Sequence, residues 1–160
     1  MTPDSLTDFL HSRIPLTAAM QLRVQPGERH AIEVRAPLAP NINVHQTAFG
    51  GSLVTLAIVA GWTLLHQALQ QDAVECAVFV QKSQCEYLLP ARGELSAAAR
   101  LPADAWREFL ADLRLHGRAR IEIEVTVSSG GQAVARHLGS FVAKAPPAAG
   151  PTESHPKATP

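Results

Sequence analysis

The chain has 160 residues, of which 46% are hydrophobic, a size that suits one domain with one core, predicted over residues 1–145. Its 14 Lys and Arg residues balance 14 Asp and Glu residues, which argues against nucleic acid or an anionic membrane as a partner. The first residues lack the basic start and apolar run of a secretory signal, so a cytoplasmic protein is expected.

The first predicted elements are a short helix around residues 5–12 and a hairpin. Apolar and polar residues alternate over residues 20–25 and again over 32–36, with Pro26 and Gly27 between them. This period of two is typical of strands, and the Pro-Gly pair of a turn.

A long apolar segment follows, and it predicts a buried helix. Between Leu53 and Leu65 only Thr55, Gly61 and Thr63 interrupt the hydrophobic residues. The run is shorter than the roughly 20 residues that cross a bilayer, and it is apolar on nearly all sides. We therefore expect a core helix that ends near Leu69 and is wrapped by other structure. Gly50, Gly51 and Ser52 open it, with Ser52 as the candidate cap.

Four strands are predicted after the helix, over residues 76–89, 94–101, 118–128 and 132–144. An additional helix is expected over residues 103–115, where Trp106, Phe109, Leu110 and Leu113 form one packing stripe. Residues 146–160 are rich in proline and poor in hydrophobic residues, which predicts a disordered tail. The fold class is thus α+β, an antiparallel six-stranded sheet wrapped around one long central helix, with accessory helices.

This order of elements resembles the hotdog superfamily. The stretch from Asn41 to Leu53, continuing to Gly61-Trp62, is similar to the putative-thioesterase family found at the end of certain bacterial acetyltransferase-like proteins; Ile14-Pro15-Leu16 fits the same family. The resemblance implies a homodimer or a dimer of dimers with sites between the subunits. It also implies malonyl-acyl-carrier-protein decarboxylase activity, which makes acetyl-carrier protein to prime fatty acid synthesis. The substrate, a thioester of acyl carrier protein or coenzyme A, carries its own phosphopantetheine, so no cofactor is expected.

The residues permit a separate comparison of hydrolysis with decarboxylation. Many hotdog thioesterases are similar in having His-Gly-Gly at the helix start and an acid seven or eight residues further on. Here Phe49 stands at the histidine position and Ile58 and Val59 at the acid positions, and no Asp or Glu occurs between Arg35 and Asp72. Hydrolysis needs an activated water or a covalent intermediate. Decarboxylation needs only donors for the enolate oxygen and an apolar wall, so the missing acid favours it.

The donors are expected at the start of the central helix. The amides of Gly50, Gly51 and Ser52 lie at the positive end of its dipole and form the predicted oxyanion site. Asn43 is the first catalytic candidate, because its uncharged amide can donate to the enolate, and Asn41 is the reserve. The alternative for both asparagines is that they satisfy the backbone of their own loop.

Further candidates have weaker support. His45 could act as an acid or base, although one histidine in a loop more often orders it or lies at the surface. Phe49, Thr47, Thr55 and Ser83 are expected to line the substrate pocket, with hydrogen bonding inside their own loop, helix or sheet as the alternative for the hydroxyl groups. Cys76 and Cys85 fit neither a disulfide framework nor a zinc pattern, and the histidines have no metal spacing, so no metal is implied. Three functions stay open: decarboxylase, thioesterase and non-catalytic acyl-thioester binding.

Overall fold

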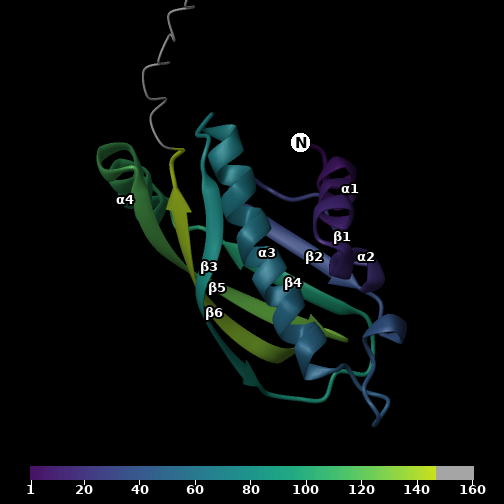
Figure 1. Ribbon diagram of the computed structural model, residues 1–160. Coiled ribbons are helices and arrows are strands. Elements are labelled where there is room, and N and C mark those ends of the chain that lie inside the picture. Colours follow the sequence, from purple (N-terminus) through teal and green to yellow (C-terminus); the bar gives the residue numbers. More distant parts are fainter. Residues whose placement is uncertain (147–160) are drawn as a thin grey trace, which may run out of the picture.

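A six-stranded antiparallel sheet curves around one long helix in the computed structural model, which describes residues 1–146 (Figure 1). The helix is α3 (Gly50–Gln71), and the strand order is β1-β2-β4-β5-β6-β3. The strands are β1 (Arg23–Val24), β2 (Ala31–Ala36), β3 (Ala77–Tyr87), β4 (Leu95–Arg100), β5 (Arg118–Ser129) and β6 (Gln132–Lys144). The predicted hotdog architecture is confirmed.

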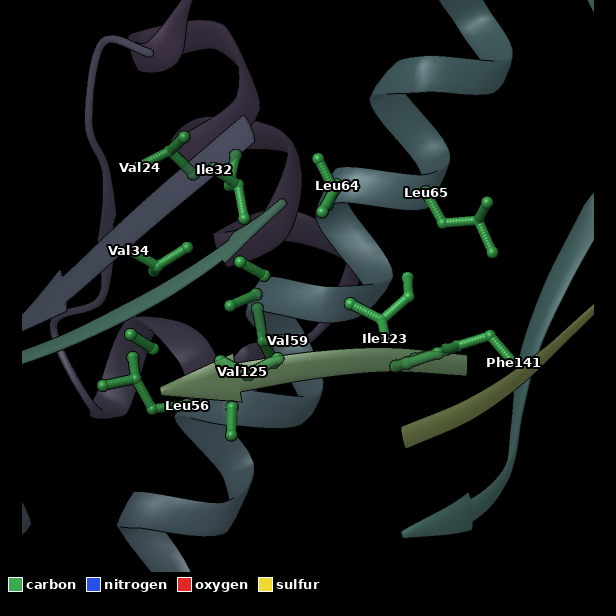
Figure 2. Close-up of a cluster of buried hydrophobic side chains, with 14 of the residues drawn as sticks. Val24, Ile32, Val34, Leu56, Val59, Leu64, Leu65, Ile123, Val125 and Phe141 are labelled. Atoms are coloured by element: carbon green, nitrogen blue, oxygen red, sulfur yellow. The ribbon is translucent and has the colours of Figure 1, made fainter. Parts of the chain in front are cut away.

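The core lies between the sheet and α3. On β5 the residues from Ala119 to Val127 are alternately buried and exposed, as the sequence pattern predicts. Figure 2 shows the sheet residues Ile123, Val125 and Phe141 in one cluster with Val59 and Leu65 of α3. This face of the sheet is called the inner face below, and the face turned away from α3 the outer face.

Helix α3 approaches the sheet closely because Gly61 has no side chain. A Cβ atom there would lie 2.9 Å from the Cζ atom of Phe141. Within the part of the chain that the structure describes, α3 is the one helix long and apolar enough to cross a membrane. Because the sheet wraps around it and most of its apolar residues are buried, α3 is the core helix of this fold.

Three accessory helices complete the fold: α1 (Pro3–Arg13), α2 (Pro15–Ala19) and α4 (Ala103–His116). The four residues of the predicted α4 stripe are all buried, and the helix ends at Gly117, whose φ of 65° favours glycine. In α1 the hydroxyl of Thr2 accepts the Ser5 amide at 3.2 Å and caps the helix.

Helix α2 was not predicted, and the starts of two elements differ from the prediction in ways that affect the hairpin and the site. The first hairpin strand shrinks to β1, because residues 20–22 are bound to α2: the Met20 amide donates to the Leu16 carbonyl and the Leu22 amide to the Thr17 carbonyl. Helix α3 begins earlier than expected. Its N-cap is Phe49, so Ser52 is the third residue of the helix and not its cap. The predicted tail over residues 146–160 lies, from residue 147 on, outside the described residues.

Candidate active site

The loop before α3 is a folded unit. An isolated bridge pairs Ile42 with Ala48, and the Phe49 amide donates to the Asn41 carbonyl at 2.7 Å. The Ala48 amide donates at 2.9 Å to the carbonyl of Ala91, in the segment that follows β3. These bonds fix the residues before the helix against the residues after β3, and so they define where α3 begins.

Two backbone amides are free at the start of α3. The amides of Gly50 and Gly51 have no acceptor in the described part of the chain, and they lie at the positive end of the helix dipole. Ser52 differs, because its amide donates to the Phe49 carbonyl at 2.9 Å. The predicted oxyanion site therefore keeps Gly50 and Gly51 and loses the Ser52 amide.

Aromatic side chains flank these two amides. The ring of Phe49 lies over Gly51, where an added Cβ atom would be 2.2 Å from its Cε1 atom. Tyr87, at the end of β3, donates its hydroxyl to the Gly50 carbonyl at 3.2 Å. Both rings are 55% exposed, so they form open walls on either side of the helix start. A larger residue at position 51 would have to displace the Phe49 ring.

Asn43 is half-buried, and its side chain orders the loop. Its Nδ2 atom donates to the Thr47 hydroxyl at 2.9 Å and to the Ala48 carbonyl at 3.2 Å. Its Oδ1 atom accepts the His45 amide at 2.8 Å. The loop-ordering alternative is thus present in the structure. To donate to a substrate oxygen, Asn43 must release one of its two Nδ2 contacts.

Asn41 and His45 occupy opposite environments. The Asn41 side chain is buried, and its Nδ2 atom donates to the carbonyls of Met20 and Pro37 at 3.0 and 2.8 Å. Both amide hydrogens of Asn41 are therefore used in holding the loop to the segments before it. His45 is exposed on the outside of the loop. Thr47 is buried against Asn43.

No carboxylate faces the helix from the described sheet. The acidic residues of β3, β5 and β6 are Glu86, Glu122 and Glu124, which lie on the outer face, and none of the inner-face residues of these strands is Asp or Glu. On α3 itself, Val59 is buried in the core, whereas Ile58 and Thr55 are half-exposed. Positions 58 and 59 are those at which many hotdog thioesterases carry their acid, and position 58 is therefore the one of the two that is open to a ligand.

Ser83 belongs to a pair that the sequence did not reveal. Its Oγ atom lies 2.8 Å from the Nε2 atom of His137 on β6. His137 is only 2% exposed, and burial lowers the pKa of its imidazole. Its Nδ1 atom has no hydrogen-bond partner among the described residues. Cys85 lies directly opposite His137, and burial raises the pKa of its thiol, which makes it a poor nucleophile.

Among the described residues, no three His, Cys, Asp or Glu side chains lie together in a way that could hold a metal ion. The candidate active site is therefore built from the Gly50 and Gly51 amides, the rings of Phe49 and Tyr87, Asn43 in its loop, and the Ser83–His137 pair.

The fold, together with the family match, defines a hotdog protein of the acyl-thioester class. More specifically, the chain belongs to the family described as "Putative thioesterase (yiiD_Cterm)", whose sequence pattern matches residues 3–145.

Solved structures agree with this family. A protein of unknown function from Chlorobaculum tepidum TLS is 26% identical, with a TM-score of 0.86 over 91% of this chain and 98% of that one. A structure described as a putative thioesterase from Shewanella oneidensis is 28% identical, with a TM-score of 0.81 over 90% and 97%. A thioesterase from Haemophilus influenzae, 13% identical with a TM-score of 0.70 over 89% and 90%, shows likeness of fold alone.

Proposed function

We propose that this protein is a cytoplasmic decarboxylase that converts malonyl-acyl carrier protein to acetyl-acyl carrier protein and so primes fatty acid synthesis. One observation carries the proposal: two free amides meet at the start of α3, while neither α3 nor the inner face of the described sheet offers a carboxylate. This arrangement can stabilise an anion but has no acid side chain to activate water.

The proposed reaction uses these groups in turn. The bond between the α-carbon and the carboxylate breaks, carbon dioxide leaves, and the electron pair moves into the thioester to form an enolate. The Gly50 and Gly51 amides, with Asn43, donate to the enolate oxygen. A proton from solvent then adds to the α-carbon and gives the acetyl thioester. An acid at position 58 would repel the malonyl carboxylate.

Hydrolysis is the second candidate, as the family's description suggests. The Ser83–His137 contact favours it specifically, since a serine beside a neutral histidine is one way to build a nucleophile. The pair lacks a third group to orient the histidine, because Nδ1 has no partner among the described residues. Non-catalytic binding of acyl thioesters is the remaining alternative.

A second copy of the chain is the proposed cover for the β3 edge. Strand β3 lies at one end of the sheet order and is exposed along most of its length. Phe79, Val80 and Tyr87 on this strand are 53%, 43% and 55% exposed. An exposed edge strand has unpaired backbone groups that can pair with another strand, and two-fold pairing through β3 would place a partner beside each helix start. A homodimer, or a dimer of such dimers, follows.

The test is to incubate the protein with malonyl-acyl carrier protein and to weigh the carrier. Acetyl-carrier protein is the product expected of the decarboxylase. Free carrier thiol would establish hydrolysis instead, and unchanged malonyl-carrier protein that nevertheless co-elutes with the protein would establish binding alone. Repeating the assay with malonyl-coenzyme A determines which carrier is preferred.

A further inference from the structure

The Ser83–His137 pair faces α3 beyond the free amides. Two contacts bracket its position along the helix: the Tyr87 hydroxyl meets Gly50 at one end of β3, and the Trp62 Nε1 atom donates to the Val78 carbonyl near the other. Ser83 lies between these points on the inner face, where the register sets it opposite Gly139. The pair therefore faces the middle turns of α3, further along the helix than Gly50.

The two members of the pair differ in accessibility. Ser83 is exposed on the edge strand, whereas His137 is buried behind it, next to Val125 on β5 and Cys85 on β3. The inner face of β3, β5 and β6 has no Lys or Arg. The serine hydroxyl is thus the member of the pair that is open to solvent in the single chain, whereas the imidazole is not.

The unpartnered Nδ1 atom favours the tautomer in which the imidazole is the donor. If His137 carried its proton on Nδ1, a buried N–H would be left without an acceptor, the kind of orphan that native proteins avoid most. With the proton on Nε2, the buried Nδ1 is a bare acceptor, and the imidazole donates to the Ser83 oxygen across the 2.8 Å contact. The serine hydrogen is then free to point away from His137. In this arrangement the histidine orients the hydroxyl and cannot take its proton.

We propose that Ser83 is a substrate-contacting donor, held in position by His137, that binds an oxygen atom which the acyl group carries in addition to its thioester carbonyl. The inference rests on the proposed function and deepens it, because it names acyl thioesters with a second oxygen, such as malonyl, as the preferred class over plain alkyl thioesters. The free amides at Gly50 and Gly51 serve the thioester carbonyl. A neutral hydroxyl orients a carboxylate without the strong attraction of an Arg or Lys, which would oppose its departure as carbon dioxide.

The test compares two probes that can be neither decarboxylated nor hydrolysed. Both are coenzyme A analogues with a methylene in place of the thioester sulfur; one bears an acetyl group and the other a sulfoacetyl group, whose sulfonate replaces the malonyl carboxylate. The parent protein should bind the sulfoacetyl probe more tightly. Ser83→Ala should weaken sulfoacetyl binding by about tenfold to a hundredfold, the size of one hydrogen bond to a charged group, and leave acetyl binding unchanged.

His137 variants test the positioning role. His137→Gln keeps a donor near the Nε2 position and should retain the preference for the sulfoacetyl probe, whereas His137→Met removes the donor and should lose it. Ser83→Thr keeps the hydroxyl and is the matched control for Ser83→Ala. Cooperative thermal unfolding verifies that each variant is folded.

Two results would overturn the inference: Ser83→Ala binds both probes more weakly by the same factor, or Ser83→Ala binds both probes as tightly as the parent does. Because binding is measured without turnover, failure of the two proposals can be told apart. If malonyl-carrier protein is not decarboxylated but Ser83→Ala selectively loses the sulfoacetyl probe, only the proposed reaction is wrong. If decarboxylation is found and the variant keeps its preference, only the role of Ser83 is wrong.

Discussion

The variant Asn43→Ala should show whether the side-chain amide of Asn43 acts in catalysis or only orders its loop. If Asn43 donates to the enolate, its loss should slow the chemical step by about a hundredfold to a thousandfold, which corresponds to about 2.7–4 kcal/mol. The variant also loses the contacts to Thr47, Ala48 and His45. Each such bond contributes about 1 kcal/mol net, and water can replace them at the surface, so we expect a loss of about 1–2 kcal/mol in unfolding free energy.

Two further variants distinguish the causes. Thr47→Val removes one partner of the Asn43 amide at similar volume and leaves Asn43 in place, so it should lower stability while reducing the rate less than tenfold by our estimate. Asn43→Asp keeps the oxygen that accepts the His45 amide but loses the donor and adds a negative charge beside the substrate. It should be at least as slow as the alanine variant.

The assay is single-turnover conversion of malonyl-carrier protein, followed by mass, with unfolding in urea measured on the same samples. Substrate affinity should change little, because a donor aimed at developing charge acts mainly in the transition state. Equal rate losses in Asn43→Ala and Thr47→Val would refute the reasoning, since Asn43 would then act only by ordering its loop. If Asn43→Ala keeps the parent rate while Asn41→Ala loses it, the rate depends on the bonds by which Asn41 holds the loop, and Asn43 is not the catalytic donor.

Three other predictions follow from the fold and the site. Ile58→Asp should weaken malonyl binding more than acetyl binding through charge repulsion; equal weakening in a protein that still unfolds cooperatively would show that position 58 lies outside the pocket. Burial lowers the pKa of His66 and His137 below the ordinary 6.5, so the unfolded chain takes up protons first and unfolding free energy should fall as the pH drops below about 6.5. The slope is at most about 1.4 kcal/mol per pH unit for each histidine, and urea titrations of His66→Gln should show a shallower fall; an unchanged slope would exclude His66 as a source. Phe79→Lys, on the outer face of the β3 edge, should convert the dimer to a monomer in sedimentation, whereas an undisturbed dimer would place the interface elsewhere.

The elements with strong periodicity could be predicted from the sequence. The alternation over residues 118–128 predicted nearly the whole of β5, and the apolar run from Leu53 to Leu65 predicted the buried helix. The alternation over residues 20–22 is real, because Met20 and Leu22 are both buried. It nevertheless led to the wrong prediction of a strand there. The backbone of this segment is bound to α2 instead of the sheet. A burial pattern does not reveal which hydrogen-bond partners a backbone takes.

The candidate site was predictable only in part. The role of Gly50 and Gly51 could be predicted from their place at the start of a helix. The sequence did not show where the first turn begins, and so it did not show that the Ser52 amide is already hydrogen-bonded. His137 required the pairing of β3 with β6. A bulge between Val80 and Lys82 shifts that register, so that Val80 and Ser83 share the inner face although simple alternation would separate them. No local pattern marks such a bulge.

The central claim is decarboxylation without hydrolysis, and the fate of the α-carbon tests it most directly. Malonyl-carrier protein is incubated with the enzyme in deuterium oxide, and the carrier is analysed by mass spectrometry. The account predicts acetyl-carrier protein with solvent deuterium in its methyl group, because an enolate must collect a proton after carbon dioxide leaves. Carrier with a free thiol, released together with intact malonate, would contradict it.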